Sequence, residues 1–267
     1  MPKIGLVAGW GKIPVTFARN AKAKGDTVIA LGLKGVTDEE LANHVDKMHW
    51  VEWGNLKKAM LLVMMEGIRQ IVLLGKIKKA VTFTGNDDLD EDAKKILSGM
   101  GSKQDYAILK GVEGILSKVG IKIIDPTPYL EDLVPKAGAL TKRQPSDKEW
   151  ADIKYGTDIA KVMAGYDIGQ AVAVKDKTII AAEAVEGTND MIKRAGSLAG
   201  GGFVVVKVAR PDQDMRFDVP AVGPDTIRLM AESRATALGL EGNKTFLTDR
   251  EEVVALADQN DIAITIM

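Results

Sequence analysis

The sequence contains no cysteine and only two histidines, His44 and His49. The absence of cysteine excludes disulfides, thiolate nucleophiles, cysteine-ligated zinc and iron–sulfur clusters. Two histidines are too few for a histidine-rich dinuclear metal centre, and they are badly placed for a Ser-His-Asp triad. Any catalysis must therefore depend on carboxylates, lysine, arginine and backbone donors.

The chain also lacks an excess of charge of either sign. It carries 36 Lys plus Arg against 37 Asp plus Glu, which gives a formal net charge of −1. Binding to a nucleic-acid backbone needs clustered excess cation, so we do not expect nucleic acid as the main partner, although a local basic groove stays open. With 46% hydrophobic and 27% charged residues, the composition is typical of a globular protein with a full-sized core.

Long hydrophobic runs are missing as well, because no stretch reaches the roughly 20 apolar residues that span a bilayer. The longest candidate, residues 59–65, is flanked by Lys57, Lys58 and Glu66. The first residues do not show the charged region, hydrophobic region and cleavage site of a signal peptide. We therefore expect a cytoplasmic protein, in which no amphipathic basic helix stands out.

A length of 267 residues favours two domains. Up to about residue 125, apolar runs alternate with helical patterns, which is typical of a parallel sheet covered by helices. The expected strands are residues 4–8, 27–33, 48–52, 71–74 and 121–124, and the expected helices are 15–24 and 55–66. We therefore predict an α/β protein whose first domain, residues 1–133, is a doubly wound, Rossmann-like parallel sheet that binds nucleotide or phosphate.

Four of the nine prolines fall within residues 125–147, so residues 134–147 are expected to form a linker. After it, Ser146 or Asp147 is expected to cap a helix. The expected elements are helices 147–164, 191–199, 225–238 and 249–260, a hairpin of strands 170–174 and 178–184, and strands 202–208, 244–247 and 262–267. They predict a second, mixed-sheet α/β domain over residues 148–267.

The turn after the first expected strand reads GWGKIP from Gly9 to Pro14. Gly9 and Gly11 would let the backbone approach a phosphate, and the following helix N-terminus would supply positive charge. The pattern is GxGxxP rather than GxGxxG, and no carboxylate ends the strand 27–33, where the ribose of NAD would need one. The turn therefore indicates a nucleotide or phosphate site rather than an NAD site. A tight turn without a ligand is the alternative.

Three lysines, Lys76, Lys78 and Lys79, follow the fourth expected strand and reach the same edge of the sheet. Such cations suit a phosphate or pyrophosphate. A solvated surface is the alternative interpretation.

The densest group of polar residues follows the apolar strand 202–208. A loop so charged after a buried strand either faces solvent or pairs with a ligand or metal. Asp214, Asp218 and Asp225 are candidate ligands of Mg2+ or Mn2+, because Mg2+ favours one or two carboxylates together with phosphate oxygens and water. For Asp225, capping of a helix is the alternative.

A second polar segment, Glu186-Gly187-Thr188, closes an expected strand and begins a helix. We expect Thr188 to cap this helix and to leave backbone N–H groups facing an anion.

These segments resemble the LpxI-type UDP-2,3-diacylglucosamine pyrophosphatases of lipid A biosynthesis. The resemblance rests on the opening GLVAGWGKIP, on the block AEAVEGT with residues 191–195, and above all on residues 207–220 with Gly223 and Thr226. It extends over both expected domains and nearly the whole chain.

The resemblance implies a hydrolase that cleaves UDP-2,3-diacylglucosamine to UMP and 2,3-diacylglucosamine 1-phosphate. It also implies a divalent metal, usually Mg2+, and attack of water on the sugar-side phosphorus. The catalytic aspartate of the family falls on Asp225, whereas Asn189 stands where the family often has Asp.

From the motifs and the resemblance together we assign roles to individual residues. The expected catalytic residues are Asp225, Asp214 and Lys207, and the expected substrate-binding residues are Gly9, Gly11, Lys76, Gly187, Thr188, Arg210, Gln213 and Arg216. A non-catalytic protein that binds nucleotide or lipid phosphate is the alternative function, and an NAD-dependent oxidoreductase is a third, disfavoured one.

The expected partner is UDP-2,3-diacylglucosamine, with at most peripheral contact with the cytoplasmic face of the inner membrane. An apolar cleft for its acyl chains is expected between the domains or within the second one. A homodimer is expected on base rates alone.

Overall fold

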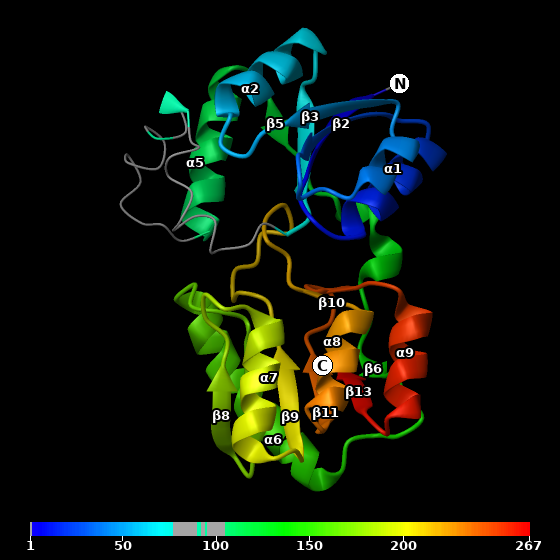
Figure 1. The fold of residues 1–267 in the computed structure, drawn as a ribbon, viewed down its shortest axis with the longest axis vertical. Helices are drawn as coiled ribbons and strands as arrows, with labels where there is room; N and C mark the ends of the chain where they lie inside the picture. Colours follow the sequence, from blue (N-terminus) through cyan, green and yellow to red (C-terminus); the bar gives the residue numbers. More distant parts are fainter. Residues whose placement is uncertain (1, 77–89, 92–93, 95–104) are drawn as a thin grey trace. The chain divides into compact units, whose positions relative to one another are not determined.

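The protein consists of two compact units (Figure 1). The computed structural model describes residues 2–76, 90–91, 94 and 105–267. The first unit comprises Met1–Glu131 and Met215–Asp218, and the second comprises Asp132–Asp214 and Val219–Met267. The chain therefore passes between the units three times, and four residues of the C-terminal half belong to the first unit.

The first unit is built on a five-stranded parallel sheet with the order β3-β2-β1-β4-β5. Its strands are β1 Lys3–Ala8, β2 Thr27–Leu33, β3 Lys47–Val51, β4 Gln70–Leu74 and β5 Lys122–Ile123. The strand order reverses beside β1, so β1 and β4 flank the switch point at which open α/β sheets bind ligands. The predicted α/β class with an N-terminal parallel sheet is confirmed.

Three α-helices are described in the first unit, with short 3-10 turns between the elements. They are α1 Ile13–Ala23, α2 Leu56–Met65 and α5 Asp105–Lys118, and the 3-10 turns are η1 Glu39–Asn43, η3 Thr127–Tyr129 and η4 Glu131–Leu133. Pro14 lies in the first turn of α1, as predicted, where its missing N–H group removes no helical hydrogen bond. None of the helices in the described ranges is long and apolar enough to cross a membrane.

Phe217, from the C-terminal half of the sequence, completes the core of the first unit. Its side chain is 1% exposed and packs in a cluster with residues of β2, β4, α2 and α5. The ammonium of Lys110 lies 5.1 Å from the centre of its ring, and the guanidinium of Arg216 lies 4.9 Å from it. Arg216 also pairs with Glu113 of α5. Residues 215–218 are thus fixed to this unit by an aromatic anchor and an ion pair.

The second unit contains a six-stranded mixed sheet with the order β6-β13-β11-β9-β7-β8. Its strands are β6 Gly138–Ala139, β7 Ala171–Lys175, β8 Thr178–Ala182, β9 Phe203–Lys207, β11 Ala235–Leu240 and β13 Ala263–Ile266. β9, β11 and β13 are parallel, whereas β6, β7 and the β7–β8 hairpin introduce antiparallel pairs. The predicted mixed-sheet domain and the predicted hairpin are confirmed.

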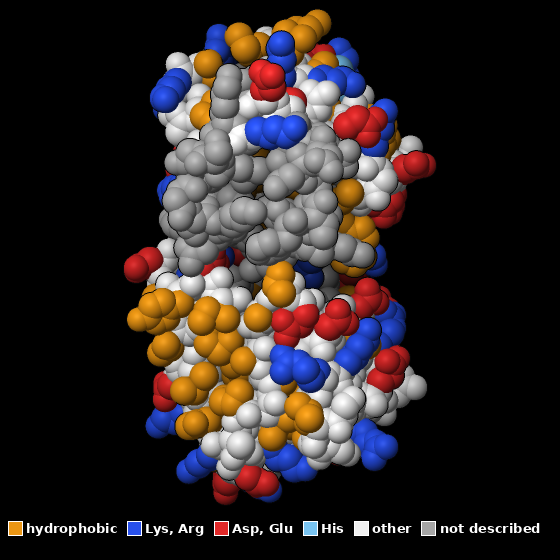
Figure 2. Space-filling view, turned by 60° about the vertical axis from the view of Figure 1, so that its left-hand side comes forward, with side chains coloured by type: hydrophobic (Ala, Val, Ile, Leu, Met, Phe, Trp, Pro, Cys, Tyr) orange, Lys and Arg blue, Asp and Glu red, His pale blue; other side chains and the backbone are white. Residues whose placement is uncertain are grey.

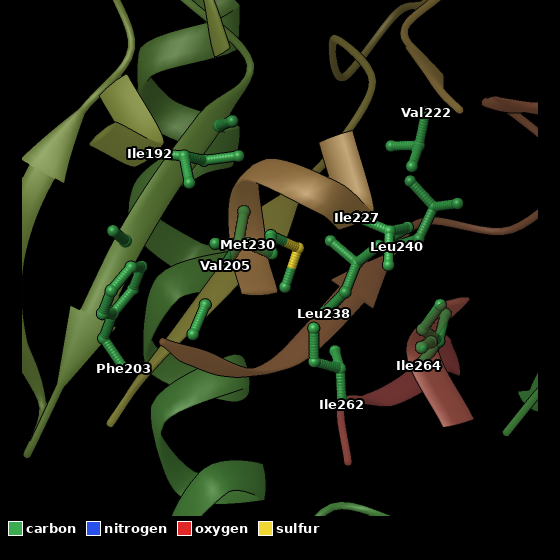
Figure 3. Close-up of a cluster of buried hydrophobic side chains, with 14 of the residues drawn as sticks. Ile192, Phe203, Val205, Val222, Ile227, Met230, Leu238, Leu240, Ile262 and Ile264 are labelled. Carbon is green, nitrogen blue, oxygen red and sulfur yellow. The ribbon is translucent and has the colours of Figure 1, made fainter. Parts of the chain in front are cut away.

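Helices cover both faces of this sheet. They are α6 Asp147–Gly165 on one face, and α7 Thr188–Ala199, α8 Pro224–Glu232 and α9 Arg250–Gln259 on the other. The central strand β9 is buried on both sides, with Phe203 and Val205 in the cluster toward α7–α9 (Figure 3) and Val204 and Val206 in the cluster toward α6. This double burial explains why β9 is apolar at every position before Lys207.

Helix α6 begins with the predicted cap, in the form of a capping box. The Ser146 hydroxyl accepts a hydrogen bond from the Glu149 N–H, and the Glu149 carboxylate accepts one from the Ser146 N–H. Burial raises the pKa of Glu149, but hydrogen bonds from Arg143 and Ser146 outweigh burial and lower this pKa to about 2. The helix start is therefore held by a carboxylate that is ionised at neutral pH.

The expected helix over residues 225–238 is wrong in its second half. α8 ends at Glu232, Arg234 takes a left-handed φ of 58°, and β11 follows at Ala235–Leu240. β11 lies in the centre of the sheet between β9 and β13. A short apolar run buried on both faces has no period of its own that separates a strand from a helix, and this ambiguity caused the error.

Two further segments differ from expectation. Only Phe246–Leu247 (β12) of the expected strand 244–247 is extended, and it pairs with β10, Ala221–Val222, in a separate two-stranded sheet. Within the expected linker, β6 adds an antiparallel edge strand to β13.

We predict that Phe217→Ala destabilises the first unit by about 3–5 kcal/mol, because a buried aromatic ring is replaced by a cavity. Hydrogen exchange at increasing urea should show loss of protection in β1, β2 and β4 and unchanged protection in β9 and β11. Phe246→Ala, which removes a ring that is 1% exposed in the second unit, is the matched control and should give the opposite pattern. Equal losses in both units for Phe217→Ala would contradict this assignment.

Candidate active site

Three helices of the second unit begin at one edge of its sheet. β9 and β11 each run to this edge and are followed by α8 and α9, which return to the opposite edge before the next parallel strand. β8 runs in the direction of β9 after two antiparallel pairings, so α7 also begins there. α7, α8 and α9 lie side by side (Figure 1). Helix N-termini present unpaired N–H groups and positive partial charge, so this edge suits an anion.

Glycines occupy the N-cap positions of two of these helices, and neither helix has a side-chain cap hydrogen bond. Gly187, before α7, has a φ of 83°, a conformation that favours glycine. Gly223, before α8, is extended, but a Cβ there would lie only 2.5 Å from the Thr248 hydroxyl oxygen. No capping side chain therefore competes with a ligand for the first N–H groups of α7 and α8.

Thr188 is the first residue of α7 rather than its cap, which corrects the expectation from the sequence. Its hydroxyl donates a 2.8 Å hydrogen bond to Glu183 Oε1 and accepts a 2.6 Å hydrogen bond from Lys207 Nζ. Lys207 Nζ also lies 3.6 Å from Glu183 Oε2. The structure thus brings Lys207, Thr188 and Gly187 together.

Glu183 received no role from the sequence, although it stands in the same motif at the end of β8. Its side chain and that of Lys207 are 12% and 7% exposed. A buried ammonium requires a carboxylate partner, and Glu183 supplies one. The pair holds the Lys207 ammonium in a fixed position beside the start of α7.

Arg210 and Gln213 shape the loop that follows β9. The Arg210 guanidinium is buried and pairs with Asp167. Gln213 accepts a 3.2 Å hydrogen bond from the Arg210 N–H, and its amide donates a 3.0 Å bond to the Asp214 carbonyl. Asp167 lies 43 residues before Arg210 with no motif around it, so the sequence carried no signal for this pair.

Asp225 lies in the first turn of α8 and its side chain is 70% exposed. It does not cap the helix; its carboxylate accepts a 2.7 Å hydrogen bond from Arg228 Nη1. The other guanidinium nitrogen of Arg228 pairs with Glu252 of α9. Asp225 is thus an exposed carboxylate that is oriented by Arg228. Arg228 is itself oriented by its ion pair with Glu252 of α9.

The three carboxylates predicted as metal ligands are divided between the units, because Asp214 and Asp225 belong to the second unit and Asp218 to the first. Within the described ranges, no group of three or more His, Asp or Glu side chains is arranged to hold a metal ion. An exposed carboxylate such as Asp225 still fits Mg2+ that takes one or two protein ligands, with phosphate oxygens and water as the others.

In the first unit, the loops after β1 and β4 touch each other. A Cβ at Gly9 would lie 2.7 Å from the Lys76 carbonyl oxygen, and Trp10 and Lys76 pair in an antiparallel bridge. The close approach of the two backbones therefore explains why residue 9 is a glycine. Gly11 has a φ of 111°, with no atom within 4 Å of its Cβ position, so there is open space before α1. Lys76 is exposed.

The two other lysines of that cluster, Lys78 and Lys79, lie outside the described residues. Arg216, expected to bind substrate, lies in the first unit and pairs with Glu113. A hydrogen bond from Lys110 lowers the pKa of Glu113, burial opposes this, and Arg216 lowers the pKa further. The described contacts of Arg216 therefore include the Glu113 carboxylate and the Phe217 ring.

Comparison with known proteins gives matches to two family models. The LpxI N-terminal domain matches residues 3–133, and the LpxI C-terminal domain matches residues 136–265. A curated relative from Caulobacter vibrioides, UDP-2,3-diacylglucosamine pyrophosphatase LpxI, is 29% identical over 97% of this chain and 95% of its own length.

Solved structures give weaker matches. The biotin carboxylase subunit of pyruvate carboxylase has a TM-score of 0.29 and 15% identity, over 65% of this chain and 35% of that chain. N5-carboxyaminoimidazole ribonucleotide synthetase from Thermotoga maritima has a TM-score of 0.29 and 17% identity, over 70% of this chain and 43% of that chain. This chain thus spans less than half of each, and these likenesses carry no argument.

We predict that Lys207→Met costs about 3–5 kcal/mol of unfolding free energy, because the buried Glu183 carboxylate loses the ammonium that balances its charge. The double variant Lys207→Met/Glu183→Gln should recover a large part of this loss, as measured by urea denaturation. Lys193→Met, which breaks an exposed pair with Asp190, is the control and should cost less than about 1 kcal/mol. Strictly additive effects of the two buried substitutions would show that they are not coupled.

Proposed function

The chain belongs to the LpxI family, and from this premise we propose that it hydrolyses the pyrophosphate of UDP-2,3-diacylglucosamine to UMP and 2,3-diacylglucosamine 1-phosphate. The reaction takes place in the cytoplasm or at the cytoplasmic face of the inner membrane. The observation that supports this proposal best is the convergence of three helix N-termini at the sheet edge that carries Lys207.

This edge would bind the diphosphate. N–H groups at the starts of α7 and α8 would donate to phosphate oxygens, and the helix dipoles would favour their negative charge. Lys207, whose charge is balanced by Glu183, adds an ammonium donor next to Thr188. Negative charge develops on the phosphate oxygens during hydrolysis, so fixed donors at these positions would stabilise the transition state.

Asp225 would accept a hydrogen bond from the attacking water and orient it. Its carboxylate is exposed, lies in the first turn of α8 and is directed by Arg228. Attack on the sugar-side phosphorus makes UMP the leaving group and forms the new P–O bond in the sugar phosphate. In the loop after β9, Asp214 would assist catalysis, and Arg210 and Gln213 would bind substrate.

We propose Mg2+ or Mn2+ as cofactor, with Asp225 as one protein ligand and Asp214, which belongs to the same unit, as a further candidate. Bound there, the metal would supply positive charge against the phosphate oxygens. Within the first unit, taken by itself, the open space before α1 at Gly11 lies beside the switch point of the sheet and suits a phosphate, and Lys76 is a candidate to bind it.

The direct test is incubation of the purified protein with UDP-2,3-diacylglucosamine and Mg2+. We expect UMP release that EDTA abolishes, and a loss of at least about 100-fold in kcat for Asp225→Asn, because the amide is a poor acceptor of a proton from water. Asp158→Asn, an exposed carboxylate on α6, is the control and should leave the rate unchanged.

Two outcomes would contradict the proposal. Saturable ligand binding by the native protein without UMP release would instead indicate the non-catalytic binding protein. Full activity of Asp225→Asn would remove Asp225 from the mechanism.

A further inference from the structure

Residues 59–65 of helix α2 are apolar on both sides of the helix, although α2 lies at the surface of the first unit. Val63 is 3% exposed and packs in the core, whereas Leu61, Met64 and Met65 are 57%, 60% and 73% exposed. Residues three and four apart share one face of a helix, so these three side chains form one apolar surface. A helix that is apolar all round is normally covered on all sides.

Two lysines extend the same outer face toward the start of α2. Lys57 and Lys58 precede Leu61 by one turn, and both are exposed. Neither ammonium forms an ion pair with any residue that the structure describes. Figure 2 shows hydrophobic side chains beside Lys and Arg side chains at the upper end of the first unit, where α2 lies in Figure 1. This outer face, of Lys57, Lys58, Leu61, Met64 and Met65, therefore has a cationic end and an apolar end.

The carboxylate that directly follows the apolar end in the chain is paired with basic side chains. Glu66, directly after α2, lies 2.5 Å from Lys47 Nζ and 2.8 Å from His49 Nε2. Lys3 Nζ donates a 2.7 Å hydrogen bond to the Glu66 carbonyl oxygen. Basic side chains thus surround Glu66 at the apolar end, and at the start of α2 the Asp90 carboxylate accepts a 2.8 Å hydrogen bond from the Lys57 backbone N–H.

We propose that the outer face of α2 docks on an anionic lipid surface. Leucine and methionine side chains enter the boundary between headgroups and acyl chains, and lysines bind acidic headgroups through long side chains that keep the charge in the polar layer. A lipid surface thus offers an apolar layer to the apolar end of the face and acidic headgroups to its cationic end.

A second copy of the chain fits this face less well. A two-fold contact of α2 with α2 would place the lysines of one copy against the apolar end of the other in antiparallel packing, or against the lysines of the other in parallel packing. Their charges would then lose water without gaining a partner. The docking face belongs to the first unit, and its test requires no enzymatic activity.

The absence of cysteine allows a single label to report the contact. Met65→Cys, carrying an environment-sensitive fluorophore, should shift its emission to the blue with vesicles of phosphatidylglycerol and phosphatidylcholine in equal parts. The same label at Leu198→Cys, a 66% exposed position on α7 of the second unit, should not shift. A shift at neither position, or at both equally, would overturn the proposal.

Vesicle co-sedimentation of the full chain tests the two ends of the face separately. Leu61→Gln/Met64→Gln/Met65→Gln should weaken binding at least about tenfold, because each side chain buries apolar area on docking. Each of Lys57→Gln and Lys58→Gln should weaken it about fivefold, and vesicles of phosphatidylcholine alone should bind the native chain weakly.

The control Val162→Gln/Ile168→Gln/Leu198→Gln removes comparably exposed apolar side chains from the second unit and should bind like the native chain. Circular dichroism melting should show that both triple variants are folded. Unchanged vesicle binding by the α2 triple variant would overturn the proposal. So would sedimentation of the native chain as a dimer that this variant dissociates, because a second copy would then cover the face.

Discussion

The parallel pairing of β9, β11 and β13 is the constraint on which the rest of the candidate site depends. Parallel neighbours require a crossover, so the helix that follows each strand must begin where the strand ends and return along the sheet. α8 and α9 therefore start at one edge, and the β7–β8 hairpin reverses the chain so that α7 starts there too. A strand-end lysine, Lys207, lies at that edge with its charge balanced by Glu183.

The loop between β9 and α8 links this edge to the first unit. It begins after Lys207 in the second unit, contributes Phe217 to the core of the first, and returns to form the cap at Gly223. Its polar residues are therefore divided by structure: Arg210 is anchored within the second unit, whereas Arg216 is anchored within the first. The charged residues of this loop are close together in the sequence, but they belong to two different units of the structure.

Much of the fold could be predicted because buried parallel strands are apolar throughout. β2 spans the predicted residues 27–33, and the Ser146 cap marked the start of α6. β11 could not be predicted. Its position depends on pairing with β9 and β13, which are separated from it in the sequence, and its apolar residues are equally compatible with a helix. The same limit applies to the site: Gly187 and Thr188 form a local motif, but the pairing of Arg210 with Asp167 joins distant segments.

Backbone amide NMR during titration with UDP reports whether the diphosphate binds at the N-termini of α7 and α8. If it binds there, we expect concentration-dependent shifts concentrated at the amides of Gly187, Thr188, Asp225 and Thr226. Saturable UDP binding without shifts at these amides would contradict binding at these N-termini.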